Sequence, residues 1–315
     1  MRGVVVVAPK VRAALAARRP VVALETTLVT HGFPHPDGLE LARILEQEVR
    51  LHGALPATVG VLDGALRVGL DADELKRLAE TQGVAKLGPS NLGAGLASGL
   101  PGSTTVGATL IAAHAAGIRV FATGGIGGVH RGESFDVSAD LLALSRHAIA
   151  VVCSGAKAVL DLPRTREALE SLGVPVLGFG TLEFPAFYSR RSGVGLDTRL
   201  DTPADLASAI TAHFALGTGS GVVVANPIPT AEELPTDLYE GAISAALAAA
   251  KTAGVAGRDV TPFLLEELRL RTAGRSLAAN RALLVSNAAL AAQLAVTLAA
   301  VQRKRPAPAR RPRSR

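Results

Sequence analysis

The sequence predicts an α/β fold with an α/β/α layered architecture, a largely parallel central sheet and a helical C-terminal section. Two observations lead to this prediction. Short runs rich in apolar, β-branched residues alternate along the 315-residue chain with segments of helical periodicity. Most of these runs contain no polar residue, which indicates strands buried on both faces, as in a parallel sheet covered by helices.

The first predicted elements lie between residues 21 and 80. Residues 21–24 (VVAL) form a buried strand, and residues 37–52 form a helix because their apolar side chains repeat at helical spacing. Residues 58–62 (TVGVL) form a second strand. Asp71 and Glu74 have the spacing of a capping box, which predicts a helix start there.

The alternation continues from residue 104 to the end of the chain. Strands are predicted at residues 118–122, 148–153, 174–179 and 221–225. Helices are predicted at residues 104–117, 161–172, 203–216, 261–272 and 276–302. Because there is no internal repeat and no obvious linker before Pro306, residues 1–302 are predicted to form a single domain.

The net charge of +6 comes from the end of the chain. Residues 303–315 hold seven Lys or Arg and no acid, and without them the chain has 26 basic and 27 acidic residues. Such a Pro/Arg-rich segment buries too little apolar surface to become ordered, so a disordered, solvated tail is predicted. Weak contact of the tail with RNA or anionic surfaces is the alternative, and no nucleic-acid partner is required.

The single cysteine, Cys153, excludes an internal disulfide and fits a reducing compartment. It lies in an apolar run and is predicted to be a buried small hydrophobe rather than a nucleophile. The apolar run near the N-terminus is too short for a secretory signal. Residues 288–301, interrupted by Gln293 and Thr297, fall short of a bilayer span. A cytoplasmic protein without a membrane partner is expected.

Polar residues follow several of the predicted strands, at the edge of the sheet where α/β proteins bind ligands. They are Glu25, Lys86, the Thr123–Gly125 loop, the Ser154–Lys157 segment and Asn226–Pro227. Partial burial would raise the pKa of Glu25 and suit a proton donor, whereas a helix-capping or salt-bridged acid is the alternative. A desolvated Lys157 would attack carbonyl carbon, whereas a lysine with its amine in solvent at a helix start is the alternative.

Residues 121–140 (FATGGIGGVHRGESFDVSAD) contain five glycines, which let the backbone close over a charged ligand or make a tight turn. Asp136 and Asp140 flank Ser138, so one carboxylate with waters could hold Mg²⁺ or Mn²⁺, or the segment could simply cap a helix. Residues 103–105 could likewise hold phosphate at a helix N-terminus or only cap that helix. From these residues alone, the sequence indicates an α/β enzyme with a Lys, a Glu and an anion-binding loop.

Four long motifs in the chain are VVALETTLVTHGFPHP, FATGGIGGVHRG, SGAKAVLDLPRTREALESLGVPVLGFGT and TPFLLEELRLRTAGRSLAANRALLVSNAALAA. They resemble the motifs of the pseudouridine-5′-phosphate glycosidases, also called the indigoidine synthase A-like family. The matching motifs occur in order from about residue 20 to residue 300.

The resemblance implies a pseudouridylate synthase activity, the reversible cleavage of pseudouridine 5′-phosphate to uracil and ribose 5-phosphate. It implies one Mn²⁺, or another divalent ion such as Mg²⁺, and a homotrimer. It makes Lys157 the nucleophile, Glu25 the proton donor and Asp136 the metal ligand. The residues that it implies for substrate binding are Lys86, Val106, Ser138, Ala139 and Asp140, with His130 and Asn280 as further site residues.

This chemistry is consistent with the residues. A C–C glycosidic bond has no leaving heteroatom to protonate, so the paired-carboxylate route of ordinary glycosidases fails. An imine between Lys157 and C1′ of an opened ribose would accept electrons as uracil leaves. Two alternatives stay open: a lysine-imine, aldolase-type lyase of another sugar phosphate, and a binding protein whose tail docks RNA.

Overall fold

The computed structural model describes residues 3–132, 136–255 and 260–304. Strands in these ranges form one 11-stranded sheet and a two-stranded sheet. The order in the large sheet is β1 (Val5–Val7), β4 (Ala65–Val68), β3 (Leu55–Leu62), β2 (Val21–Leu24), β7 (Val120–Ala122), β9 (Ala150–Cys153), β13 (Val222–Ala225), β11 (Val176–Phe179) and β12 (Arg199–Leu200). Strand β6 (Gly102–Thr104) pairs with β3 and with β5 (Ala85–Leu87), and β8 (Val129–His130) pairs with β10 (Leu160–Asp161).

The central strands are parallel. Every neighbouring pair from β3 through β12 is parallel, whereas β3 pairs antiparallel with β4 and β6. In β2, β7, β9 and β13 each residue is apolar and buried, as expected for strands covered on both faces.

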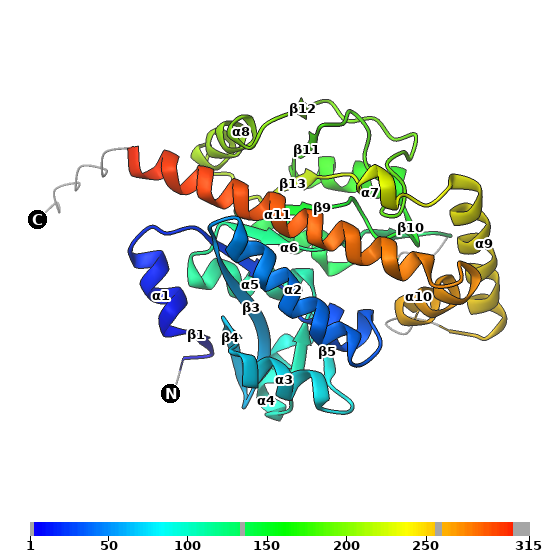
Figure 1. Cartoon of the computed structure of the whole chain (residues 1–315), viewed down its shortest axis with the longest axis horizontal. Coiled ribbons are helices and arrows are strands. Elements are labelled where there is room, and N and C mark those ends of the chain that lie inside the picture. The colour runs from blue at the N-terminus through cyan, green and yellow to red at the C-terminus, as the bar shows by residue number, and fades with distance from the viewer. Residues whose placement is uncertain (1–2, 133–135, 256–259, 305–315) are drawn as a thin grey trace, which may run out of the picture.

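Helices cover both faces of the sheet (Figure 1). On one face α11 (Arg275–Lys304) lies against β7 and β9 and packs beside α2 (Asp37–Leu51) and α8 (Pro203–Ala215). On the other face α5 (Val106–Ala116) packs against α6 (Ala139–Arg146) and contacts β2 and β3, and α7 (Leu162–Ser171) lies beside α6. This layering confirms the predicted α/β/α architecture.

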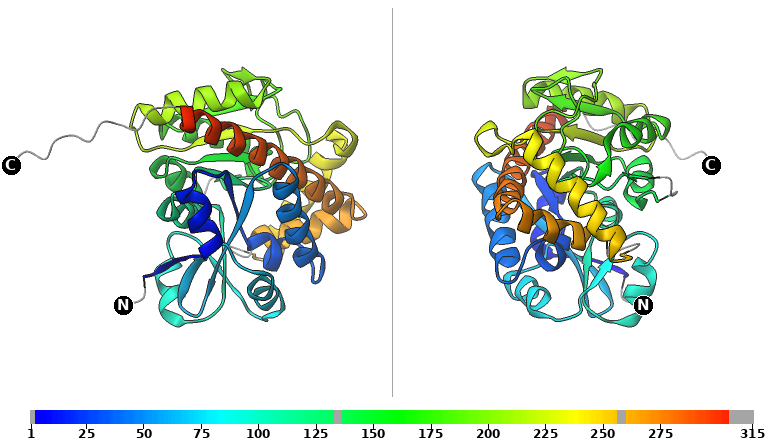
Figure 2. Two further views of the ribbon diagram at one scale, coloured as in Figure 1. Left: turned by 60° about the vertical axis from the view of Figure 1, so that its left-hand side comes forward. Right: turned by 90° about the vertical axis from the view of Figure 1, so that its right-hand side faces the viewer.

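The C-terminal section is helical, as predicted. Helices α9 (Thr236–Thr252) and α10 (Val260–Arg271) pack side by side, as Figure 2 shows on its right. Helix α10 also contacts α11 and the π-helical turn η1 (Leu28–Gly32). The remaining helices are α1 (Pro9–Ala16), α3 (Ala72–Glu80), α4 (Leu92–Ser98) and the 3₁₀ turn η2 (Thr230–Glu232).

By length and composition alone, Arg275–Val301 of α11 could cross a membrane. The expectation that this region falls short of a bilayer span was therefore wrong on those two criteria. Within its apolar 18-residue window 56% of the residues are nevertheless buried, and the helix packs against the sheet and its two neighbouring helices. These contacts account for its apolar composition.

The predicted elements are confirmed with small shifts at their ends. Strand β3 begins at Leu55, three residues before the predicted start, and both halves of the Asp71–Glu74 capping box form. The helix predicted from residue 104 begins only at Val106, because Gly102–Thr104 pair with β5 and β3 as strand β6. The basic tail predicted at residues 303–315 lies outside the described residues from residue 305 onward.

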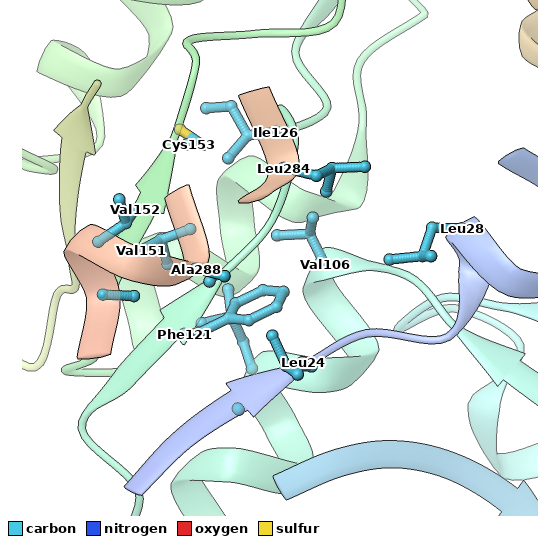
Figure 3. Packing of buried hydrophobic residues seen from close by; sticks show 14 of the residues in the cluster. Leu24, Leu28, Val106, Phe121, Ile126, Val151, Val152, Cys153, Leu284 and Ala288 are labelled. Carbon is cyan, nitrogen blue, oxygen red and sulfur yellow. The ribbon is translucent and has the colours of Figure 1, made fainter. Parts of the chain in front are cut away.

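The core lies between the sheet and α11. Figure 3 shows Phe121 of β7 beside Leu24 of β2 and Ala288 of α11, and all three are buried. Cys153 at the end of β9 is fully buried, and burial raises the pKa of its thiol to about 12. The cysteine is therefore protonated at neutral pH, in agreement with the prediction of a buried hydrophobe rather than a nucleophile.

Candidate active site

A cavity that opens to solvent lies at the carboxyl ends of the parallel strands. Its polar lining comes from Glu25 after β2, Lys86 in β5, Thr123 after β7 and Lys157 after β9. Helices and loops cover it with apolar side chains, which are Leu28, Phe33, Phe187, Leu265 and Leu284. A mostly apolar cavity with a few convergent polar groups is typical of a small-molecule site.

Lys157 is positioned by a turn that requires glycine. Gly155 has φ +81°, and a Cβ there would collide with the carbonyl oxygen of Pro185. The backbone N–H of Lys157 donates to the Ile126 carbonyl at 3.0 Å, and the N–H of Ile126 donates to the Gly155 carbonyl at 3.1 Å. The loops after β7 and β9 therefore hold each other, and the lysine leaves this junction toward the cavity.

Glu25 is 7% exposed and directly follows β2. The Thr123 hydroxyl donates to its Oε1 at 2.5 Å. Burial raises the pKa of the Glu25 carboxyl, and it outweighs the nearby Lys157 charge and the Thr123 hydrogen bond, which both lower that pKa. The protonated carboxylic acid is thus favoured in the cavity that the Lys157 amine also lines, which suits a proton donor.

His31 also lines the cavity, although the sequence interpretation did not assign it a role. Its Nδ1 lies 2.6 Å from the Thr30 hydroxyl and 3.2 Å from the Ser103 hydroxyl. Burial, and then the charge of Lys86, lower the pKa of His31, which favours the neutral ring. In the sequence, His31 lies inside the family motif VVALETTLVTHGFPHP, and this position could have identified it. The π-helical turn that brings His31 to the cavity has no comparable sequence pattern.

Asp140 is 4% exposed and holds two backbone segments together. Its Oδ1 accepts from the N–H of Gly107 at 2.8 Å, and its Oδ2 accepts from the N–H of Gly127 at 2.9 Å. Ser138 is the N-cap of α6, so the capping interpretation of this segment is confirmed. Through these two hydrogen bonds Asp140 joins the glycine loop to the start of α5.

The glycines of the loop are explained by the protein's own side chains. A Cβ on Gly127 would collide with Ser138 and Asp140, one on Gly128 with Thr165, and one on Gly125 with Phe187. Residues 124–128 show no left-handed backbone. Close packing, rather than an unusual backbone conformation or a bound ligand, is the reason visible in the structure for these glycines.

Of the predicted site residues, the structure brings Glu25, Lys86, Lys157 and Asn280 to one cavity. The others do not line it: Val106, His130, Asp136, Ser138, Ala139 and Asp140. Val106 is fully buried in the core, so only its backbone at the start of α5 could meet a ligand.

Asp136 lies outside the cavity lining, and its backbone carbonyl accepts from the N–H of His130 at 2.9 Å. Its carboxylate is 47% exposed and approaches His130 Nδ1 at 3.9 Å. Within residues 3–132, 136–255 and 260–304, no three His, Cys, Asp or Glu side chains form a group that could hold a metal. A hydrated ion with one carboxylate ligand fits these residues, whereas an ion fully coordinated by protein does not.

Two sequence expectations for the site were wrong. Asn226 after β13 does not line the cavity; its amide is buried and donates to Asn287 Oδ1 at 2.9 Å. Ser103 and Thr104 are not at a helix N-terminus but in strand β6, where the Thr104 hydroxyl donates to the Val59 carbonyl at 2.9 Å. Thr105 alone caps α5, which favours capping over the proposed phosphate cradle.

The comparisons with known proteins agree with one another. A family model described as indigoidine synthase A like protein matches residues 10–297. The chain is 56% identical over 293 residues to a protein of Methylobacterium nodulans named pseudouridine-5′-phosphate glycosidase, covering 92% of this chain and 87% of the relative. A relative of the same name from Solibacter usitatus is 50% identical over 292 residues, covering 92% and 98%.

A solved structure has the same fold. It is the prealnumycin C-glycosynthase AlnA in complex with ribulose 5-phosphate, with a TM-score of 0.90 and 39% identity. The match covers 97% of this chain and 100% of that one.

Proposed function

The chain belongs to the indigoidine synthase A-like family, and we propose on this premise that it cleaves pseudouridine 5′-phosphate reversibly to uracil and ribose 5-phosphate. The observation that carries the proposal is that Lys157 and Glu25 line one cavity, at the ends of two strands that flank β7. An amine and a buried acid in one cavity are what the cleavage of a C–C glycosidic bond requires. The likeness to AlnA, a C-glycosynthase crystallised with a pentulose phosphate, supports the same substrate class.

The reaction proceeds through an imine. The Lys157 nitrogen bonds to C1′ while the C1′–O4′ bond breaks and O4′ takes up a proton. The nitrogen lone pair then forms the C=N bond as the bond from C1′ to uracil C5 breaks and C5 gains a proton. Water hydrolyses the imine, which releases ribose 5-phosphate and regenerates the amine.

Glu25 moves the protons in this scheme. Burial raises the pKa of its carboxyl, which favours the acid form as a donor to O4′ or C5. The Thr123 hydroxyl occupies Oε1, which leaves Oε2 to carry the transferred proton. Apolar walls around both groups exclude bulk water from the imine.

The remaining polar groups hold the substrate. Lys86, which lines the cavity, supplies positive charge for the phosphate, and the Asn280 amide supplies a donor and an acceptor for uracil or ribose. Val106, Ser138, Ala139, Asp140 and His130 complete the binding residues that the family resemblance implies.

Asp136, half-exposed and close to His130, would hold a hydrated Mn²⁺ or another divalent ion. When bound, the ion would supply positive charge to the oxygens of the phosphorylated substrate. We include in the proposal a homotrimer, as the resemblance implies, and a cytoplasmic location, as the sequence indicates, and sedimentation would test the trimer.

The test measures the release of uracil and its consumption in the reverse reaction. We expect the protein with Mn²⁺ to release uracil from pseudouridine 5′-phosphate, and to form that nucleotide from uracil and ribose 5-phosphate, both followed by chromatography with ultraviolet absorbance. Unphosphorylated pseudouridine is the control and should react far more slowly, since it lacks the phosphate. No reaction in either direction, together with cleavage of another sugar phosphate, would contradict the proposal and favour the aldolase-type alternative.

A further inference from the structure

Asn287 of α11 is fully buried and touches three strand ends at once. Its Nδ2 donates to the Thr123 carbonyl at 2.9 Å and to the Gly124 carbonyl at 3.4 Å, both after β7. The same nitrogen lies 3.2 Å from the Ser154 hydroxyl, after β9. Its Oδ1 accepts from Asn226 Nδ2, after β13, at 2.9 Å.

Only a primary amide satisfies this arrangement. The position needs a side chain with two N–H donors for nearby carbonyl and hydroxyl oxygens. The same side chain must also carry an oxygen that accepts from the amide of Asn226. An apolar side chain of similar size would leave the buried Thr123 carbonyl without this partner, and a carboxylate would face two carbonyl oxygens. Asn287 itself does not line the cavity, whereas Thr123 and Gly124, to whose carbonyls it donates, do.

Both reacting groups depend on the strand ends that Asn287 joins. The Thr123 carbonyl accepts a hydrogen bond from Asn287, and the Thr123 hydroxyl donates one to Glu25. Ser154 begins the turn that ends at Lys157, and its N–H donates to the Gly124 carbonyl at 2.8 Å. One side chain therefore links the loop that binds the acid to the loop that carries the amine.

We propose that Asn287 is a positioning residue. It holds the Thr123 hydroxyl on Glu25 and thereby orients the Glu25 carboxyl relative to the Lys157 amine. This role rests on the proposed function and goes beyond it, because no ligand contact is involved. Loss of the amide would let the Thr123 loop relax away from Glu25. Misplacement of reacting groups by about 1 Å costs on the order of 100-fold in rate.

The pH dependence separates this role from a purely structural one. The charged groups that act on Glu25 are Lys157 after β9, Lys86 in β5 and Asp140 in α6, and Thr123 is its hydrogen-bond donor. Because that hydrogen bond lowers the pKa of Glu25, loosening it moves the pKa upward. Activity that needs the acid form would then persist to higher pH than in the unmodified protein.

The experiment compares Asn287→Ala with Ser220→Ala. Ser220 is also buried and also donates to a backbone carbonyl, that of Gly173 at 2.8 Å, but it lies just before β13, away from the cavity. For Asn287→Ala we expect kcat to fall about 10- to 100-fold, KM to change little and the alkaline limb of the pH profile to move upward. Ser220→Ala should lower only the melting temperature.

A double-mutant cycle tests whether the effect passes through Thr123. Thr123→Val removes the hydroxyl, so adding Asn287→Ala to it should move the alkaline limb no further. Should Asn287→Ala not fold, Asn226→Ala, which removes the amide that donates to Asn287 Oδ1 and to Ser286 Oγ, is expected to give the same changes to a smaller extent.

The proposal would be overturned by a folded Asn287 or Asn226 variant that keeps the wild-type kcat and the wild-type alkaline limb of the pH profile. In such a variant only the melting temperature would be lowered. Absence of uracil release by the wild type would instead refute the proposed function. In that case the rate of borohydride-trapped adduct formation with ribose 5-phosphate gives the same comparison between variants.

Discussion

At the scale of single residues, Glu25 decides much of the chemistry. It comes directly after four buried apolar residues, and its carboxyl has a hydroxyl donor in Thr123 and a positive neighbour in Lys157. Burial of the carboxyl prevails over both, so its pKa is raised. The residue keeps a proton where an exposed glutamate would have lost it.

The raised pKa of Glu25 predicts how the stability of the protein changes with pH. Since the folded state binds the Glu25 proton more tightly than the unfolded state, the contribution of this group to stability is complete at low pH and is lost as pH rises through the folded-state pKa. Glu25→Gln cannot ionise and avoids that loss. We therefore expect its melting temperature, relative to wild type, to be higher at about pH 8 than at about pH 5, with uracil release abolished.

Thermal unfolding at the two pH values measures this difference. The control is Glu80→Gln, an exposed acid at the end of α3, which should alter neither the pH trend nor the activity. A melting-temperature difference for Glu25→Gln that is the same at both pH values would contradict the raised pKa.

Which site residues could be predicted depended on where they lie. Glu25 and Lys157 stand at the ends of apolar strands, so a general rule about α/β sheets located them. Asn226 obeys the same rule, yet it faces α11 and the cavity lies elsewhere. His31 was missed because a π-helical turn, which has no sequence signature, carries it into the cavity.

At the scale of elements, α3 shows how far a local pattern reaches. Asp71 accepts from the backbone N–H of Asp73 and Glu74, and Glu74 Oε2 accepts from the N–H of Asp71. These bonds need only four neighbouring residues, so the sequence predicts them well. Strand β4 and the short β6 depend on pairing with β3, which the local sequence does not reveal.

The capping box of α3 gives a prediction without effect on catalysis. Asp71→Ala removes the side-chain acceptor for two helix N–H groups, so we expect a loss of about 1 kcal/mol in the free energy of unfolding. Denaturant titration measures it, with Asp73→Ala as the control because Asp73 caps nothing with its side chain in α3. Uracil release should stay unchanged in both, and a stability loss no larger in Asp71→Ala than in Asp73→Ala would disprove the capping contribution.

Helix α9 was not predicted although its sequence carried a signal. Residues 241–250 (GAISAALAAA) are rich in alanine, which has the highest helix propensity. Alanine also blurs the difference between buried and exposed faces, so hydrophobic periodicity gives little guidance there. Propensity was the better criterion for this element.

At the scale of the whole molecule, the cavity joins residues from 25 to 284 in one place. Strands β2, β7 and β9 supply the reactive groups, and α11, which crosses in front of the sheet in Figure 1, is both a core helix and a cavity wall. The sequence predicts the strands and the α/β class, but the order in which the strands pair follows from long-range contacts. The motifs shared with the family pointed to Asn280 on α11, which strand ends alone could not have identified.

The most direct test of the account is to trap the imine on Lys157. The protein is incubated with ribose 5-phosphate and Mn²⁺, reduced with borohydride, digested and examined by mass spectrometry. We predict a reduced sugar-phosphate adduct on the peptide that contains Lys157, absent in a folded Lys157→Ala variant and retained in Lys76→Ala, which changes a surface lysine paired with Glu80. An adduct that forms equally in Lys157→Ala, or no adduct in a protein that still releases uracil, would contradict the account.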